Sequence, residues 1–188
     1  DDLLDIDRLL DEDGLAGIPP PDPILDGWLY RNSIAFLIGP PKKGKTFVAL
    51  DLALSIATGT ECVGGTRTTP GRVLYVLGEG VAGSHDRVIA WRTARDEHGP
   101  ASITFLPVAV QLRAADQLAE LYEICVGLDV DLIIIDTFAR AAVGVEENSS
   151  KEMGEVIAGM DRLKESTGAC ILTVHHTGKD ATRGYRGS

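Results

Sequence analysis

Residues 34–51 read IAFLIGPPKKGKTFVALD, and Gly39–Thr46 within them (GPPKKGKT) fits the P-loop pattern G-x-x-x-x-G-K-[ST] without a mismatch. The apolar run Ile34–Ile38 before the loop is typical of a buried parallel strand. The segment Phe47–Ala57 after it has apolar residues at helical spacing and is closed by Gly59. This order of strand, loop and helix predicts a nucleoside triphosphate site. The alternative is a glycine-proline turn that carries lysines by chance.

The residue types of the loop suit the chemistry of phosphate binding. Gly39 and Gly44 let the backbone curl so that its N–H groups point at phosphate oxygens, and the helix start adds its positive dipole end. We expect Lys45 to reach the β- and γ-phosphates and the Thr46 hydroxyl to take one position on Mg²⁺. The residues predicted to contact the nucleotide are Gly39, Pro40, Pro41, Lys42, Lys43, Gly44, Lys45, Thr46 and Phe47.

Two further predicted strands end near carboxylates. The strand Arg72–Leu77 is followed by Glu79, which we expect to polarise the water that attacks the γ-phosphate. A simple acid at a helix N-terminus is the alternative for Glu79. The apolar strand Asp131–Asp136 has the Walker B arrangement, in which Asp136 holds Mg²⁺. A strand that ends in aspartate is a weak signal alone, but beside a P-loop it predicts a magnesium site.

The last predicted strand, Ala169–Val174, is followed by His175 and His176. We expect one of the two imidazoles to sense the γ-phosphate, with a structural role as the alternative. Metal binding by the pair is disfavoured because adjacent residues on a strand point to opposite faces. The remaining elements are a strand at 103–108 and helices at 84–98, 115–126 and 153–166. Strands that alternate with helices predict a P-loop α/β sandwich with a mostly parallel sheet.

Residues 1–26 differ in composition from the rest of the chain. They alternate Asp with Leu and Ile and then become rich in Gly and Pro, which predicts an acidic arm on an extended linker. Docking of the arm on a neighbouring subunit and packing on its own domain both stay open. Residues 27–188 are predicted to form the α/β domain, whose final strands we expect to follow Ser188. Trp28 is expected to be a core or edge aromatic, with base stacking as the second interpretation.

Composition limits the classes of function and location. A net charge of −10 argues against a broadly basic nucleic-acid-binding surface, although a local basic loop is compatible with it. The three cysteines lack metal-like spacing, and the apolar surroundings of Cys125 and Cys170 predict core thiols of a reduced, cytoplasmic protein. No apolar run reaches the about 18 residues that a membrane span needs, and the acidic start is unlike a signal peptide.

Together these motifs resemble the RecA-like hexameric ATPases of the RepA replicative helicase group, which are encoded by plasmids and phages. The resemblance runs from about Trp28 onward and rests on GPPKKGKT, GRVLYVLGEG, LIIIDTFAR, EENSS, and HHTGK with RGYRGS. It implies a RecA-like core that assembles as a hexameric ring, with ATP and Mg²⁺ bound between subunits. It also implies a cytoplasmic location in a bacterial or phage-infected cell.

The resemblance assigns roles to individual residues. The catalytic residues that it implies are Lys45, Glu79, Asp136 and His176, with His175 as the alternative γ-phosphate sensor. In such families the loops after the aspartate strand and after the His strand face a central channel, here residues 140–150 and 179–188. The residues expected to contact single-stranded DNA are therefore Arg140, Lys179, Arg183 and Arg186. The arginine finger of the family usually lies beyond the His strand and is not assigned.

Three functional hypotheses follow. The first is an ATP-hydrolysing motor that depends on single-stranded DNA and acts in replication or recombination. The second is a DNA-processing factor whose ATPase regulates strand exchange or a nucleolytic step. The third is a P-loop switch that regulates another protein with slow turnover. A metabolite kinase is disfavoured because the sequence contains no recognisable lid-like arginine cluster.

Overall fold

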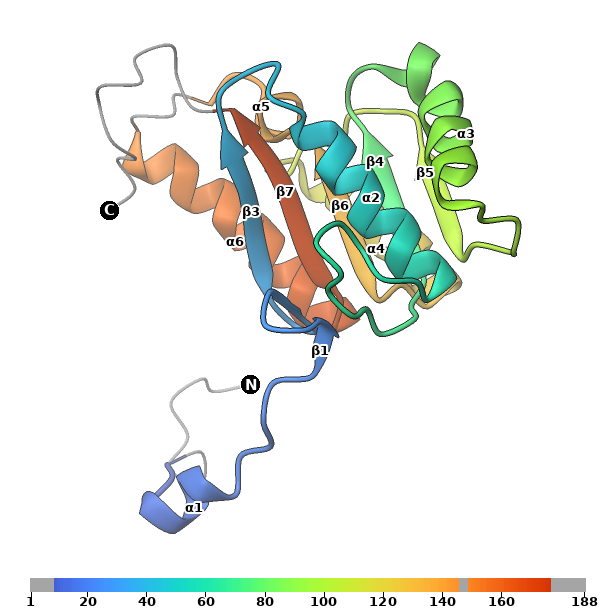
Figure 1. Ribbon diagram of the computed structural model, residues 1–188. Coiled ribbons are helices and arrows are strands. Elements are labelled where there is room, and N and C mark those ends of the chain that lie inside the picture. Colours follow the sequence, from blue (N-terminus) through green and yellow to red (C-terminus); the bar gives the residue numbers. More distant parts are fainter. Residues whose placement is uncertain (1–8, 146–148, 177–188) are drawn as a thin grey trace.

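A parallel sheet forms the centre of the protein (Figure 1). Its strands are β3 (Ile34–Gly39), β4 (Val73–Leu77), β5 (Ile103–Leu106), β6 (Leu132–Asp136) and β7 (Cys170–His176). The computed structural model describes residues 9–145 and 149–176. Within them the five strands lie in the order β3-β7-β6-β4-β5, and every pairing is parallel. Strands β3 and β7, the first and last of this sheet in sequence order within the described residues, are therefore neighbours.

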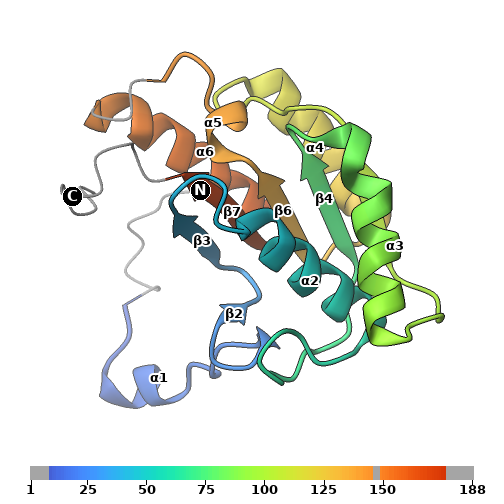
Figure 2. The same ribbon diagram turned by 45° about the horizontal axis from the view of Figure 1, so that its top comes forward.

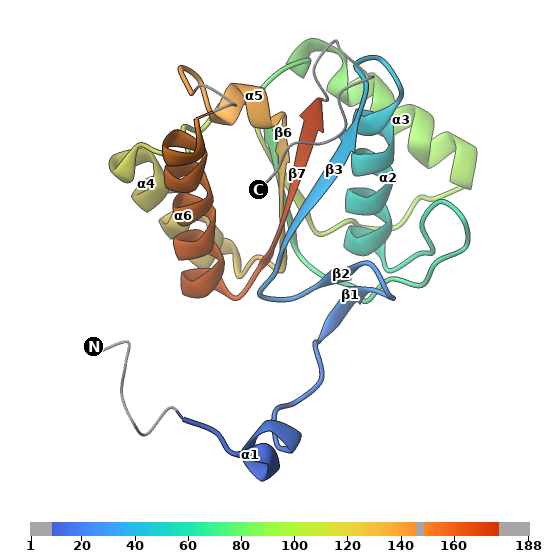
Figure 3. The same ribbon diagram turned by 90° about the vertical axis from the view of Figure 1, so that its left-hand side faces the viewer.

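Helices cover both faces of the sheet. They are α2 (Lys45–Thr58), α3 (Ser84–Arg95), α4 (Ala115–Leu128), the short α5 (Phe138–Ala141) and α6 (Ser150–Thr167). A view along the sheet shows α2 and α3 on one side and α4 and α6 on the other (Figure 3). The predicted α/β sandwich with a parallel sheet is confirmed.

The central strands are apolar without interruption because both of their faces are buried. On β4, Tyr75 packs into the core beneath α2, whereas Leu74 and Val76 pack into the core beneath α4 and α6. On β6, Ile134 packs into the core beneath α2, and Ile133 packs into the core beneath α4 and α6. Alternation of side chains along each strand thus supplies two separate apolar layers, and both hold the sheet in place.

A two-stranded hairpin precedes the main sheet. Its strands are β1 (Pro23–Leu25) and β2 (Leu29–Tyr30), which pair antiparallel. Ile24 and Leu25 are buried in the core on the α2 side. The packed domain therefore begins at Pro23, before the expected boundary between residues 26 and 27. Burial of these two apolar side chains outweighs the local abundance of proline, which is typical of a linker.

The described part of the arm lies away from the domain (Figure 1). Its short helix α1 (Glu12–Ala16) contains no buried residue. Four large apolar side chains in and around this helix are exposed: Leu9, Leu10, Leu15 and Ile18. The expectation that Trp28 is a core aromatic is wrong, since the residue is 74% exposed. Trp28 lies at the turn between β1 and β2, where the hairpin directs it to solvent.

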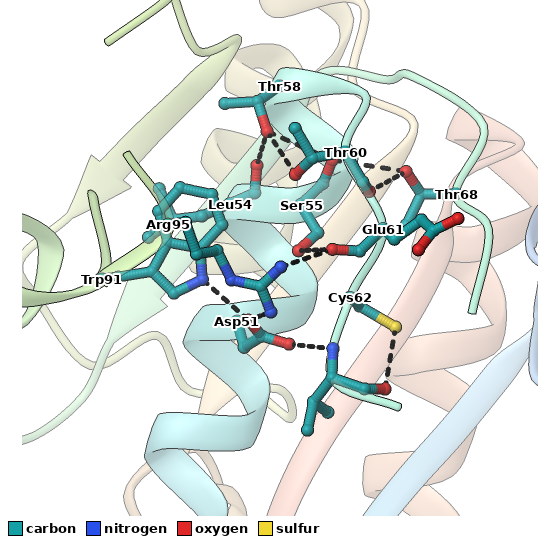
Figure 4. A network of polar contacts seen from close by, with 11 residues as sticks. Asp51, Leu54, Ser55, Thr58, Thr60, Glu61, Cys62, Thr68, Trp91 and Arg95 are labelled. Atoms are coloured by element: carbon teal, nitrogen blue, oxygen red, sulfur yellow. Dashed lines mark hydrogen bonds and ion pairs between the residues drawn. The ribbon is translucent and has the colours of Figure 1, made fainter. Parts of the chain in front are cut away.

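Asp51, in the second turn of α2, is the centre of a polar network (Figure 4). Its Oδ1 accepts hydrogen bonds from Trp91 Nε1 (2.7 Å) and from the Arg95 guanidinium, which also forms an ion pair with it. Its Oδ2 accepts from the backbone N–H of Val63 at 2.6 Å. The Arg95 guanidinium also lies 5.1 Å from the centre of the Trp91 ring. One carboxylate thus connects α2, α3 and the loop that follows α2.

All three cysteines, Cys62, Cys125 and Cys170, are buried and free, which confirms the core thiols predicted at Cys125 and Cys170. Burial raises the pKa of each thiol, that of Cys125 to about 12. A search of the described residues finds no helix with the length and apolar character that a membrane crossing requires.

Candidate nucleotide-binding site

The predicted site residues meet where the strands of the sheet end. In register, Gly39 of β3 lies beside His176 of β7, and Asp136 of β6 lies between Val174 of β7 and Leu77 of β4. Figure 2 shows the loop between β3 and α2 at this carboxyl edge. Open α/β sheets bind their ligands at this edge. The fold therefore places the P-loop, the aspartate strand and the His strand side by side.

Two residues of the P-loop have a left-handed backbone conformation. Lys42 and Gly44 have φ angles of 61° and 83°, in the left-handed region that glycine adopts without strain. Helix α2 begins at Lys45, two residues before the predicted start, and no side chain caps its first turn. The N–H groups of that turn lack intrahelical partners and are suited to phosphate oxygens. Pro40, Pro41, Lys42 and Lys43 are exposed on the outside of the loop.

Lys45 is folded back into the loop. Its Nζ donates hydrogen bonds to the carbonyl oxygens of Gly39 (2.8 Å) and Pro40 (2.7 Å), and the side chain is only 7% exposed. Burial lowers the pKa of the Lys45 ammonium, and the charge of Asp136 acts in the opposite direction. The Lys45 ammonium is thus held against the backbone of the loop, where the charge of Asp136 acts on it.

Asp136 is buried, with 2% of its surface exposed, and its two oxygens differ in environment. Oδ2 accepts a hydrogen bond of 2.9 Å from the Tyr75 hydroxyl, whereas Oδ1 has no hydrogen-bond partner among the described residues. Burial raises the pKa of the Asp136 carboxyl, and the nearby hydroxyls of Tyr75 and Thr46 act in the opposite direction. Burial also raises the pKa of the Tyr75 hydroxyl, which stays protonated as a donor.

The residues present fit a magnesium ion. A bare buried carboxylate oxygen and the nearby Thr46 hydroxyl are hard oxygen donors of the kind that Mg²⁺ prefers. The described residues contain no group of three or more His, Cys, Asp or Glu side chains that could hold a metal alone. Mg²⁺ usually takes one or two protein ligands and completes its shell with phosphate oxygens and water.

Glu79 and His176 face each other across the site. His176 Nε2 lies 3.9 Å from Glu79 Oε1, and both side chains are partly exposed. His175 instead lies on the other face of β7, where its ring meets the edge of the Phe138 ring at a centroid distance of 5.1 Å. The sequence left the two histidines as alternatives. The structure places His176 on the side of the P-loop and His175 beside α5.

Arg87 connects the turn after Glu79 to the first turn of α2. Its guanidinium lies 5.6 Å from the centre of the Phe47 ring, in a cation–π arrangement. A Cβ added at Gly80 would be 3.4 Å from a guanidinium nitrogen, so Arg87 also packs on that turn. Phe47, predicted to contact nucleotide, is 62% exposed at the edge of the site.

The predicted DNA contacts are only partly within the described residues. Arg140 is exposed at α5, and a Cβ at Gly78 would lie 2.9 Å from the Arg140 Cβ, so its stem is next to the strand that leads to Glu79. Lys179, Arg183 and Arg186 lie outside the described residues.

Sequence reasoning missed two side chains. Tyr75 reads as an ordinary residue of a buried strand, and only the β4–β6 pairing shows that it reaches Asp136. Gln111 reads as a loop residue, yet its side chain bonds the backbone of Arg140 (2.8 Å) and Val143 (3.1 Å). No local pattern could have revealed either contact, since both join segments that are distant in sequence.

Comparison with known proteins agrees with this geometry. The model of the family described as AAA domain matches residues 1–182. A crystal structure of a KaiC-like protein from the hyperthermophilic archaeon Pyrococcus horikoshii is similar in fold, with a TM-score of 0.56 and 15% sequence identity. The similarity covers 87% of this chain and 74% of that chain. The RecA-like P-loop NTPase fold that the motifs predict is thereby confirmed.

Proposed function

This chain belongs to the AAA domain family, and we propose that it is an ATPase motor that depends on single-stranded DNA in replication or recombination. The family and the fold make it a P-loop NTPase. The observation that carries the proposal further is the 3.9 Å approach of His176 to Glu79, beside the P-loop. His176 would thus lie between the phosphate site and Glu79, the acid proposed to activate water. A polar side chain in this position can couple ATP hydrolysis to the binding of a second ligand.

In this proposal each residue has a defined task. The amides of the first turn of α2 and the Lys45 ammonium hold the β- and γ-phosphates of ATP. Thr46 and Asp136 would hold Mg²⁺, which when bound offsets the charge on the phosphate oxygens. Glu79 accepts a hydrogen bond from the attacking water and orients it for in-line attack. His176 donates to a γ-phosphate oxygen, so its position changes when that phosphate leaves.

Assembly as a ring of identical subunits, hexameric as in the RepA group, belongs to the same proposal. Three apolar side chains at the P-loop edge, Ile38, Phe47 and Val48, are exposed in the isolated chain. Exposed apolar groups that border a ligand site suit a surface covered by another subunit. Contact of DNA with Arg140, Lys179, Arg183 and Arg186, and a cytoplasmic location, are further parts of the proposal.

Steady-state hydrolysis of ATP with and without single-stranded DNA tests this function. We expect DNA to stimulate turnover several-fold in the wild-type protein. Lys45→Ala should reduce turnover by about 10²–10³-fold, the cost of removing one preorganised charge from the transition state. Lys151→Ala, at an exposed lysine in the first turn of α6, is the matched control and should leave turnover unchanged.

Two results would contradict the proposal. Hydrolysis that survives Lys45→Ala at the wild-type rate would reject the P-loop as the site of chemistry. ATP binding without any effect of DNA would reject the motor and favour a regulatory switch, an alternative that the net charge of −10 supports. A DNA-processing factor would show DNA-stimulated turnover together with strand exchange or cleavage of the added DNA.

A further inference from the structure

We propose that Tyr75 is a positioning residue of the magnesium site. Its hydroxyl engages one oxygen of Asp136 and leaves the other as the oxygen presented to the cation. This inference rests on the proposed nucleotide site and assigns a role to a residue that carries no P-loop or Walker B signature.

The strand register explains how Tyr75 reaches Asp136. Tyr75 pairs with Ile134 on β6, and Leu77, two residues further, pairs with Asp136. Tyr75 and Ile134 both pack in the core on the α2 side, and Asp136 follows Ile134 on the same face of its strand. A diagonal neighbour across two strands is within reach only of a long side chain. The phenol spans that distance and bonds Oδ2 at 2.9 Å.

The position of the hydroxyl is fixed by packing. Tyr75 is fully buried, and its ring lies 5.7 Å from that of Phe105 on β5, with the planes tilted by 36°. A ring enclosed in a close-packed core cannot swing to another rotamer without displacing its neighbours. Because the Tyr75 ring on β4 is held in place, the hydrogen bond fixes the orientation of the Asp136 carboxylate.

The two carboxylate oxygens then have separate tasks. Oδ2 is engaged by Tyr75, while Oδ1 is buried and lacks a hydrogen-bond partner in the described part of the chain. Groups that hold a metal-binding side chain in place typically affect metal affinity by 10–100-fold. Without the hydroxyl, Oδ2 would be a buried acceptor without a donor, and the carboxylate would turn toward whichever donor is nearest. The cation would lose a ligand held in one orientation.

The variant Tyr75→Phe tests this role because it removes one oxygen atom and keeps the ring. Binding of a fluorescent ATP analogue is measured first without Mg²⁺ and then during a titration with Mg²⁺. We expect unchanged affinity for the analogue alone and an affinity for Mg²⁺ in the complex that is lower by about tenfold. The matched control is Tyr122→Phe, a half-buried tyrosine on α4 at the other face of the sheet, which should leave both values unchanged.

A double-mutant cycle separates positioning from a general effect on the fold. Asp136→Asn removes the charge on which Tyr75 is proposed to act, so Tyr75→Phe should then change the Mg²⁺ affinity by less than about twofold. A second readout is the melting temperature of each variant's nucleotide complex, measured with and without Mg²⁺. The difference between the two values is independent of the baseline stability of the variant.

Different results would overturn the role of Tyr75 and the proposed nucleotide site. If Mg²⁺ changes analogue binding equally in the wild-type protein and in Tyr75→Phe, this inference is overturned and the proposed site is not. Equal losses from Tyr75→Phe in the wild-type and Asp136→Asn backgrounds would also overturn it, because the effect would then bypass Asp136. Wild-type protein that binds the analogue no better with Mg²⁺ than without would overturn the proposed site, and this inference with it.

Discussion

Replacing Asp51 by alanine should destabilise the protein by about 3–4 kcal/mol. The substitution leaves two half-buried N–H donors, Trp91 Nε1 and the Val63 amide, without their acceptor, at about 1 kcal/mol each. It also removes the ion pair with Arg95, whose side chain is 30% exposed while that of Asp51 is 11% exposed. Such an intermediate pair lies between the surface and buried cases and contributes about 1–2 kcal/mol.

Thermal unfolding followed by tryptophan fluorescence measures this loss. Trp28 is exposed, so Trp28→Phe gives a background in which Trp91, which bonds Asp51, is the reporter. In that background Asp51→Ala should lower the melting temperature by about 10 °C, since about 1 kcal/mol corresponds to 2–4 °C at this size. Glu120→Ala, an exposed acid in the middle of α4, is the control and should cost less than about 0.5 kcal/mol.

A loss from Asp51→Ala that matches the control would refute the reasoning, because it would mean that water satisfies the three donors as well as the carboxylate does. Asp51→Asn adds a finer test. An amide of the same shape keeps one acceptor oxygen but points an NH₂ group at the remaining donors. Its stability should therefore fall between wild type and Asp51→Ala.

Three further outcomes are expected. Glu79→Gln should slow hydrolysis by about 10²–10⁴-fold while ATP still binds, and parallel loss of binding would reject a role in activating water. Gly159→Ala should destabilise by about 1–3 kcal/mol in urea, because its Cβ would lie 2.1 Å from the Leu112 carbonyl oxygen; Gly154→Ala on the same helix, with open space around it, should stabilise by about 0.5–1 kcal/mol. Cys125, whose pKa burial raises to about 12, should resist iodoacetamide at pH 8 until the protein unfolds.

The parts that the sequence predicts well are those whose signal is local. The P-loop lies between its own strand and helix, so Gly39–Thr46 carries its structural context within a few residues. The strand that ends in Asp136 and the strand before Glu79 are apolar runs that only a buried sheet accommodates. From such segments the α/β sandwich and the position of the site at one sheet edge follow directly.

The parts that escaped prediction depend on which segments pair. The choice of His176 over His175 needs the face of β7, and the bond from Tyr75 to Asp136 needs the register of β4 on β6. Trp28 was misjudged because its exposure depends on a hairpin turn that composition does not reveal. Strand order and register depend on packing between segments that are distant in sequence, so a short stretch of sequence does not reveal them.

The neighbouring positions of β3 and β7 have a consequence for how the protein is made. In the described sheet β3 pairs with β7 alone, and next to that pairing Ser33 Oγ donates to Cys170 Sγ across 137 residues of sequence. A ribosome adds that many residues in roughly 7–27 s at 5–20 residues per second. During this interval the strand that carries the P-loop has no partner in the sheet, and its apolar residues are open to chaperones. The strand that carries the P-loop therefore gains its partner in the sheet only after Cys170–His176 has been synthesised.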